Sequence, residues 1–158
     1  MIKTEFIDDW LDKELADFLS VYFYRDIPYY TGHTSLPHSS RSHLSGNIPA
    51  SCMTDFLFHK MQKIIPSKFV VMYTNLQYAG MDGDWHPDIG EGADTTFLYM
   101  LSKNVEGGQF IIQNEKKYEY KFNRLIWFDA RQIHKGLAPT NNVPRITLAF
   151  KTKRPVKK

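Results

Sequence analysis

The feature that most constrains the fold of this chain is a change of hydrophobic period at Pro66. Beyond it, short segments rich in β-branched and aromatic residues follow one another, separated by Gly, Asn, Asp or Pro: FVVMYTNLQYA, TTFLYML, GQFIIQ, KYEYKF, RLIWFDA and RITLAFK. Such segments are typical of β-strands. No helical pattern lies between them, which excludes a parallel βαβ arrangement and favours an antiparallel barrel or double-sheet roll.

Before Pro66 the apolar residues recur with a period close to that of an α-helix. This pattern predicts an amphipathic helix from Phe6 to Phe23 and a second helix from Met53 to Ile65. Between them, residues 26–50 are rich in Ser, Gly, Pro and His, which predicts a long irregular segment that serves as a lid or binding loop. The fold class is therefore α+β and mainly β, with N-terminal helices packed outside a β-roll core.

The length of 158 residues suits one domain with a substantial core. We expect a single domain over residues 1–158. Residues 1–66 should form the supporting helices and the long loop, residues 67–151 should form the β core, and residues 152–158 should form a basic tail.

Charge and cysteine content argue against several classes of function. The net charge is +3, but five basic residues fall in the last eight positions, so residues 1–150 carry −2. The near-neutral charge of residues 1–150 argues against binding to nucleic acid, because a protein that binds nucleic acid needs a basic face. The single cysteine, Cys52, predicts a reducing, cytoplasmic setting, and no segment approaches the ~20 apolar residues of a membrane span. The oligomeric state is left open.

Three side chains with metal-binding atoms stand out in the β-rich half. His86 and Asp88 are two positions apart in GDWHPDIG, and in an extended segment such residues point to the same side. By itself the pair is weak evidence, since it also occurs in ordinary turns. His134, in the loop before the last predicted strand, can complete the two-histidine, one-carboxylate triad of non-haem Fe(II) sites. The HExxH pattern typical of zinc is missing.

The last predicted strand, RITLAFK, places a cation among cavity-facing residues. Its alternation sends Arg145, Thr147 and Ala149 to one face, and the three apolar residues Ile146, Leu148 and Phe150 to the core. A guanidinium inside a roll needs an anionic partner, and its fork matches a carboxylate. No buried acid in the sequence competes for it, so we expect the carboxylate of a ligand.

Taken in order, these segments resemble the Fe(II)- and 2-oxoglutarate-dependent dioxygenases, and within them the compact bacterial or phage type of the prolyl 4-hydroxylase-like group. The matching elements are YAG followed by WHPD, a strand leading into EGGQF, then RLIWFDARQIHKGLAP and PRITLAF. The resemblance runs from about Val70 to Phe150, half of the chain, with a vaguer echo in FIDDWLDKELADFL. It implies a double-stranded β-helix, or jelly-roll, core.

The resemblance also implies a set of site residues. His86, Asp88 and His134 would bind Fe(II) and form the catalytic centre. Arg145 would bind the distal carboxylate of 2-oxoglutarate, with Thr147 adding a hydrogen bond from the same face. O₂ would be the second co-substrate, and ascorbate an optional reductant.

Tyrosines and a further arginine complete the implied co-substrate and substrate contacts. Tyr78, before Ala-Gly, matches the position of a tyrosine hydroxyl that helps to hold the co-substrate. Tyr99 is a weaker candidate, because a shift of one residue in the alignment would turn it to the core. Arg131 matches a basic residue near the substrate channel, or is a plain surface arginine.

The three histidines of the Ser-rich segment have a simpler interpretation. His33, His38 and His43 are five positions apart, which places them on no common face of a helix or strand. We expect no second metal site there.

The leading hypothesis is a dioxygenase that hydroxylates an aliphatic carbon, with a prolyl residue in a peptide or protein as substrate. The same chemistry on a free amino acid or a nucleobase is the alternative, and a nucleobase would require stacking and basic contacts that the charge balance argues against. The third hypothesis is that the chain is a catalytically inactive β-roll binding module. The intact triad together with Arg145 argues against it.

Overall fold

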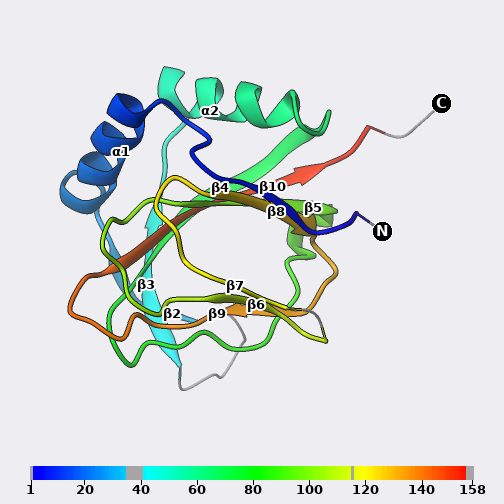
Figure 1. The fold of residues 1–158 in the computed structure, drawn as a ribbon. Coiled ribbons are helices and arrows are strands. Elements are labelled where there is room, and N and C mark those ends of the chain that lie inside the picture. The colour runs from blue at the N-terminus through cyan, green and yellow to red at the C-terminus, as the bar shows by residue number, and fades with distance from the viewer. Residues whose placement is uncertain (1, 35–40, 115, 156–158) are drawn as a thin grey trace.

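The computed structural model describes residues 2–34, 41–114 and 116–155, and these form three layers (Figure 1). The helices α1 (Lys13–Arg25) and α2 (Cys52–Gln62) lie on one side of a seven-stranded sheet, and a three-stranded sheet lies on the other side. In spatial order the larger sheet contains β1 (Glu5–Ile7), β8 (Leu125–Asp129), β5 (Thr95–Met100), β10 (Arg145–Lys153), β4 (Lys68–Gln77), β3 (Ser42–Asn47) and β2 (Tyr30–Thr34). The smaller sheet contains β7 (Lys117–Tyr118), β6 (Phe110–Ile112) and β9 (His134–Gly136).

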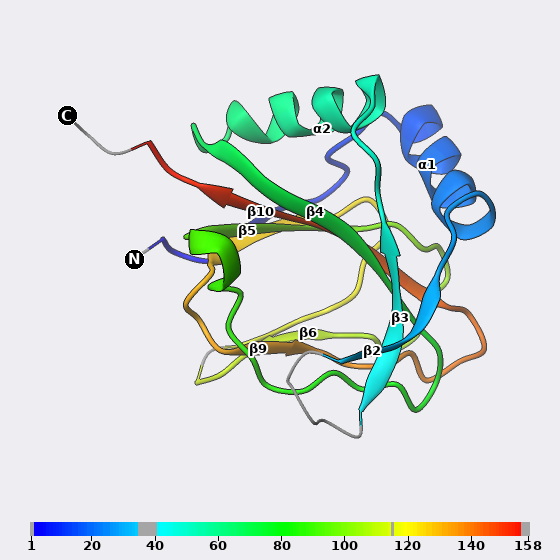
Figure 2. The same cartoon turned by 180° about the vertical axis from the view of Figure 1, so that it is seen from behind.

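The predicted fold class is confirmed. All strand pairs are antiparallel, the helices pack outside, and the two sheets face each other as in a jelly roll (Figure 2). The six predicted strands correspond to β4, β5, β6, β7, β8 and β10. β9 lies where a loop was predicted. It is only three residues long, and it forms by pairing with β6.

The first helix begins later than the sequence predicts. Residues 5–7 form β1 against β8, and the chain then turns at Asp9, which has a positive φ of 50°. The side chain of Asn123 fixes this turn, since it accepts a hydrogen bond from Leu11 N at 3.0 Å and donates one to Leu11 O at 2.8 Å. The helix starts only at Lys13 because the preceding backbone is held in these long-range contacts.

The segment predicted to be irregular, residues 26–50, contains two strands. β3 pairs with β4, with Leu44 opposite Leu76, and β2 pairs with β3 in turn. Few apolar residues mark β3, whose sequence is SHLSGN. The hydrogen-bonding edge of β4 therefore explains the strand better than local sequence preference does. Residues 35–40 lie outside the described part of the chain.

The second helix follows the prediction closely. Ser51 caps α2, with its hydroxyl accepting from Thr54 N and its own N–H donating to Thr54 Oγ1, a reciprocal arrangement that defines the N-terminus. At the other end of the chain, β10 runs to Lys153, and Arg154 N donates to the Asp94 carboxylate. The expected basic tail thus starts inside an ordered strand. Within the described residues, no helix is long and apolar enough to cross a membrane.

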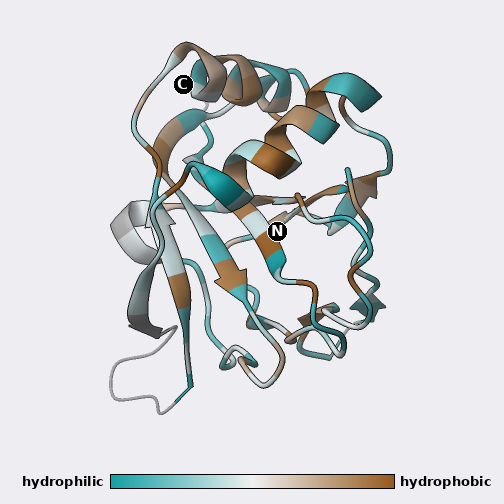
Figure 3. Cartoon of the chain, turned by 90° about the vertical axis from the view of Figure 1, so that its left-hand side faces the viewer, coloured by the Kyte–Doolittle hydropathy of each residue, from teal (hydrophilic) through white to brown (hydrophobic). Residues whose placement is uncertain are grey.

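Two apolar clusters stabilise the layers. The larger lies between the helices and the seven-stranded sheet, and the smaller lies between the two sheets. Figure 3 shows apolar stretches along both helices and on strands of the sheet. The larger cluster includes Leu19, Phe23, Leu57, Met61, Phe97, Leu148 and Phe150, and the smaller includes Met100, Phe110, Ile112, Ile126 and Phe128. The second cluster fills only part of the space between the sheets, and a cavity occupies the rest.

Candidate metal centre and active site

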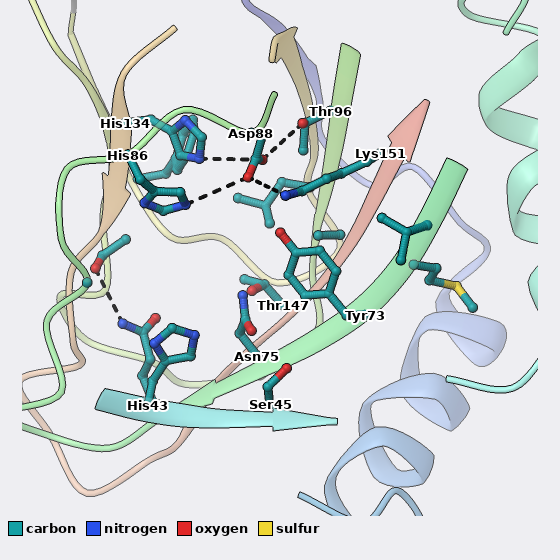
Figure 4. A pocket seen from close by; sticks show the side chains of 18 of the residues that line it. His43, Ser45, Tyr73, Asn75, His86, Asp88, Thr96, His134, Thr147 and Lys151 are labelled. Carbon is teal, nitrogen blue, oxygen red and sulfur yellow. Dashed lines mark hydrogen bonds and ion pairs between the residues drawn. The ribbon is translucent and has the colours of Figure 1, made fainter. Parts of the chain in front are cut away.

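A cavity of about 790 Å³ lies between the two sheets. Its walls come from β2, β3, β4, β5, β8 and β10 of the larger sheet, from β6 and β9 of the smaller sheet, and from the loop that contains His86 and Asp88. Figure 4 shows side chains from these elements pointing into it. The cavity is large enough for a small-molecule ligand.

His86, Asp88 and His134 meet at one end of this cavity. One ligand atom from each lies within 4.8 Å of the others. Two backbone hydrogen bonds of 3.0 Å join His86 to His134 as an isolated β-bridge. These hydrogen bonds hold the loop against β9, and they bring His86 close to His134 although the two are far apart in the sequence.

The backbone also sets which imidazole nitrogen is available. His86 Nδ1 lies 2.8 Å from Asp84 O, and His134 Nδ1 lies 2.9 Å from Gln132 O. Since a carbonyl oxygen only accepts, each Nδ1 carries the proton and each Nε2 carries a lone pair. The two Nε2 atoms face the Asp88 carboxylate at 3.7 and 3.5 Å. This orientation is typical of histidines that bind a metal through Nε2.

Asp88 provides the third candidate ligand and leaves one oxygen without a hydrogen bond. The residue is 3% exposed, and Thr96 Oγ1 donates to its Oδ2 at 3.0 Å. Oδ1 is buried and accepts no hydrogen bond from the described residues, although the Lys151 ammonium lies 2.9 Å away as an ion pair. Lys151 balances the charge of this carboxylate, and the two imidazole nitrogens that face it complete a set of three donor atoms. The donor set therefore fits a divalent metal ion.

Electrostatics keep these groups in the protonation states that a metal needs. Burial lowers the pKa of His134 to about 4, so the imidazole is neutral at pH 7. Burial alone would raise the pKa of Asp88, but His134, Lys151 and His86 outweigh it and hold this pKa below its usual value. The site thus presents a neutral His134 imidazole and an ionised Asp88 carboxylate, as metal binding requires.

Arg145 lies in the same cavity, on β10. It is 2% exposed, its Nε donates to Gly108 O at 2.8 Å, and its Nη1 donates to Gln77 Oε1 at 2.7 Å. Within the described residues, no carboxylate pairs with it. Burial lowers its pKa to about 10, so the guanidinium stays charged at neutral pH. Two of its five N–H donors have these protein acceptors, which leaves donors for an anionic ligand.

The guanidinium is held between an aromatic ring and close-packed backbone. The Tyr120 ring centroid lies 5.3 Å from Arg145 Cζ, and the Tyr120 hydroxyl donates to Ile146 O at 2.6 Å. On another side, a Cβ built on Gly136 would lie 3.1 Å from Arg145 Nη2. Only a residue without a side chain fits there with the arginine in place.

The other predicted co-substrate residues lie in different surroundings. Thr147 lines the cavity and is 1% exposed. Tyr78 is 40% exposed, follows the end of β4, and is not among the residues that line the cavity. Its role as a co-substrate ligand stays a prediction that the cavity lining does not favour.

Tyr99 and Arg131 each have a structural partner. Tyr99 belongs to the larger apolar cluster, where its hydroxyl donates to Asn123 Oδ1 at 2.9 Å. Arg131 is paired through two nitrogens with the buried Asp129 carboxylate, at 2.7 and 2.6 Å. This pair raises the pKa of Arg131 and lowers that of Asp129. Neither residue lines the cavity.

The histidines of the Ser-rich segment contribute one cavity residue. His43, on β3, lies opposite His33 of β2 in the strand register and lines the cavity. His38 lies outside the described residues. Among the described residues, the only group of three or more candidate metal ligands is the triad at His86, Asp88 and His134.

The cavity residues that the sequence analysis missed include four polar side chains on β4 and β10. Tyr73, Asn75 and Gln77 alternate along β4 and face the cavity, and Lys151 does so near the end of β10 (Figure 4). The alternation of side chains along a strand would have placed all four on the cavity side. The sequence analysis used this alternation on β10 only as far as Phe150, and did not use it on β4.

The comparisons with known proteins agree with this geometry. No family model and no curated protein matches the sequence. Among solved structures, a 2OG-Fe(II) oxygenase family oxidoreductase from Burkholderia pseudomallei superposes with a TM-score of 0.75 at 10% identity, over 96% of this chain and 85% of that one. This chain has the fold of the 2OG-Fe(II) oxygenases.

Two prolyl hydroxylases share the oxygenase fold with this chain. A viral collagen prolyl hydroxylase from Paramecium bursaria Chlorella virus-1, solved with 2OG, has a TM-score of 0.73 at 15% identity over 96% of each chain. A prolyl hydroxylase from Trichoplax adhaerens, solved with a peptide fragment of the hypoxia inducible factor oxygen degradation domain, has a TM-score of 0.74 at 16% identity, over 95% of this chain and 83% of that one. At these identities the likeness concerns the oxygenase fold.

Proposed function

We propose that this chain is an Fe(II)- and 2-oxoglutarate-dependent oxygenase that hydroxylates an aliphatic carbon, with a prolyl residue of a peptide or protein as the leading substrate. One observation carries the proposal. A single cavity contains both a metal-ligand triad and, apart from it, a buried guanidinium without an acidic partner among the described residues. A metal site alone suits many hydrolases, but the additional buried cation requires an anionic co-substrate.

The triad would hold Fe(II) from one side. His86 and His134 present Nε2 and Asp88 presents Oδ1, which leaves the other coordination positions to ligands from the cavity. With 2-oxoglutarate and O₂ bound, the ferrous ion would supply the oxygenase chemistry, in which 2-oxoglutarate loses CO₂ to give succinate and the two atoms of O₂ end in succinate and in the hydroxyl group of the substrate. The chain itself positions the reactants and excludes water.

Aromatic rings provide the water exclusion around the triad. The centroid of Phe128 lies 4.6 Å from that of His134, and the centroid of Phe110 lies 5.4 Å from it. Both rings are at most 2% exposed. They fix the imidazole plane, and they keep the low-dielectric surroundings in which the charges of Asp88 and a metal attract strongly.

Arg145 would fix the far end of 2-oxoglutarate. Its remaining donors can bind the distal carboxylate in a fork, and Gln77 and Gly108 hold the guanidinium in place for this contact. Thr147, one alternation further along β10, offers a hydroxyl in the same cavity. A dicarboxylate held at both ends has little freedom, which favours a productive orientation.

The peptide substrate is supported by two of the fold neighbours, a viral collagen prolyl hydroxylase and a prolyl hydroxylase bound to a peptide. A nucleobase substrate is less well supported, since residues 1–150 carry a net charge of −2 and offer no basic groove by composition. An inactive binding module is not favoured either. The triad and Arg145 keep the chemistry that a purely structural domain does not need.

The test is turnover with defined variants. The protein is incubated with Fe(II), ascorbate and 2-oxoglutarate, with and without proline-rich peptides, and succinate and the mass gain of one oxygen atom are followed. We expect His134→Ala to reduce succinate to background and to weaken Mn(II) binding measured by electron paramagnetic resonance. Arg145→Gln should raise the KM for 2-oxoglutarate roughly 10- to 100-fold, the value of a lost charge-assisted contact.

The matched control is His59→Ala, because His59 is exposed on α2, away from the cavity. It should leave metal binding and turnover unchanged. Succinate that forms equally well in the His134 and Arg145 variants would contradict the oxygenase assignment. Succinate that depends on both residues, without a mass gain in any peptide, would keep the oxygenase and remove the peptidyl-prolyl substrate.

A further inference from the structure

Lys151 is a second cation inside the cavity. It follows Arg145 by six positions on β10 and shares the cavity-facing side of that strand. Its side chain is 16% exposed, and its Nζ lies 2.9 Å from Asp88 Oδ1 and 5.3 Å from the centroid of the Tyr73 ring. Figure 4 shows the ammonium directed toward the triad, with the Tyr73 hydroxyl pointing to the same place. A largely buried lysine in this position requires an anionic partner, and without a metal ion that partner is Asp88.

The charges of the loaded cavity do not balance without a further anion. Among the described lining residues the charged side chains are Arg145, Lys151 and Asp88, with a sum of one positive charge. A divalent metal adds two positive charges, and doubly ionised 2-oxoglutarate removes two. One positive charge is left, and the Asp88 carboxylate that Lys151 contacts is then shared with the metal.

The two cations serve different anions. Six residues of strand place the Cα atoms of Arg145 and Lys151 about 20 Å apart. The Arg145 head group is held by Gln77 and Gly108, whereas the Lys151 head group lies at Asp88. A lysine head on its flexible stem can turn from Asp88 to a ligand without moving the backbone. Arg145 therefore suits the co-substrate, and Lys151 suits a second ligand.

A neutral group on β4, opposite Thr147 in the strand register, adds to the recognition chemistry of the same cavity. Asn75 Oδ1 lines the same cavity, is buried, and has no hydrogen-bond partner among the described residues. An amide oxygen of this kind requires an N–H donor. Figure 4 shows Asn75 beside Thr147, on the same side of the cavity as Tyr73. A cation and an unpaired acceptor together match the carboxylate and the nitrogen of an amino acid.

We infer that Lys151 binds the α-carboxylate of the substrate, so that the hydroxylated residue is a free amino acid or the C-terminal residue of a peptide. The inference rests on the proposed oxygenase function and narrows its substrate. Nothing in the contacts of Arg145 or the triad requires it, so the two proposals can fail separately.

The experiment measures binding without turnover. The protein is loaded with Mn(II) and 2-oxoglutarate under nitrogen, and three probes are titrated by calorimetry: L-proline, a short peptide that ends in proline with a free carboxylate, and the same peptide as its C-terminal amide. We expect one or both carboxylate probes to bind, and the amide to bind much more weakly. The two carboxylate probes distinguish a free amino acid from a peptide terminus.

The variants are chosen on one strand. Lys151→Met, which keeps the length of the side chain, should weaken binding of the carboxylate probes roughly 10- to 100-fold and leave the affinity for 2-oxoglutarate little changed. Lys151→Arg should retain most of the affinity. Lys153→Met is the matched control, since Lys153 is exposed and does not line the cavity, and it should behave as the wild type.

Equal binding of acid and amide, no binding of either carboxylate probe, or a Lys151→Met effect confined to 2-oxoglutarate would overturn the inference. The proposed function is tested apart from it by succinate formation that requires His134. Carboxylate binding through Lys151 without any succinate would keep the binding site and reject the oxygenase. Succinate formation together with equal binding of the carboxylate and amide probes would keep the oxygenase and reject the carboxylate-binding site.

Discussion

The two faces of β10 are equally buried but differ in what their burial does to the protein. On one face Ile146, Leu148 and Phe150 pack beneath the helices and are at most 2% exposed. On the other face Arg145, also 2% exposed, and the residues that alternate with it line the cavity. The first face removes apolar surface from water and stabilises the fold. The second face removes charge from water and costs stability until a ligand pairs with it.

The pKa of Arg145 expresses this cost. Burial lowers it to about 10, well below the ordinary pKa of a guanidinium, which means that the folded protein disfavours the charged form relative to water. The guanidinium is nevertheless charged at neutral pH, so the penalty is present under working conditions. Substitutions on the core face of β10 should therefore lower the stability of the protein, whereas substitutions on its cavity face should mainly weaken ligand binding.

The largest effect is expected on the core face. Phe150→Ala removes a fully buried ring that stacks on Phe58, with centroids 6.5 Å apart, and should lower the free energy of unfolding by roughly 3–5 kcal/mol in urea denaturation. Phe69→Ala is the matched control on the adjacent strand. Phe69 is 51% exposed, so its loss should cost less than about 1 kcal/mol. An equal loss of unfolding free energy in the two variants would show that the core does not depend on the face of β10 that contains Phe150.

The next effect concerns ligand-induced stability on the cavity face. For wild-type protein with Mn(II), 2-oxoglutarate at 100 times its Kd should raise the free energy of unfolding by about 2.7 kcal/mol. At the same ligand concentration, Arg145→Met, with binding weakened roughly 10- to 100-fold, should cut this gain to about 0.4–1.4 kcal/mol. Without ligand, the same variant should change stability by less than about 1.5 kcal/mol, because relief of the buried charge offsets the lost hydrogen bonds. A ligand-free cost as large as that of Phe150→Ala would assign Arg145 a structural role.

How much the sequence predicts depends on whether local pattern or long-range pairing determines an element. The segment RITLAFK alternates clearly, so both faces of β10 were predicted, with Arg145 and Thr147 on the polar side. The spacing of His86 and Asp88 likewise placed two groups on one side. His134 was proposed as the third ligand from its residue type, and the family resemblance implied the same set of three. The β-bridge that brings His134 to His86 joins residues 48 positions apart, and local pattern does not contain it.

The elements that were missed lack a local signal. β1 and β3 form because they meet the edges of β8 and β4, and their own sequences, EFI and SHLSGN, carry no alternation. Lys151 stood in a run of basic residues that is typical of a solvated end. On β4 and the residue that follows it, Tyr73 lines the cavity and Tyr78 does not, since the pairing of Arg145 with Gln77 sets which residues of β4 share the cavity side. Only the register between distant strands determines that choice.

The smallest predicted effect tests whether backbone contact positions the cavity cation. Gly136 has no positive φ, and the three atoms nearest to a Cβ built there, at 3.1–3.2 Å, all belong to the Arg145 guanidinium. Gly136→Ala should therefore keep the fold but displace the fork from Gln77, which we expect to weaken 2-oxoglutarate binding roughly 3- to 10-fold, or about 1 kcal/mol, by calorimetry. Gly90→Ala is the control, because a Cβ at Gly90 meets nothing within 4 Å. If both variants bind the co-substrate like the wild type, the guanidinium has room to shift, and Gln77 and Gly108 alone determine its position.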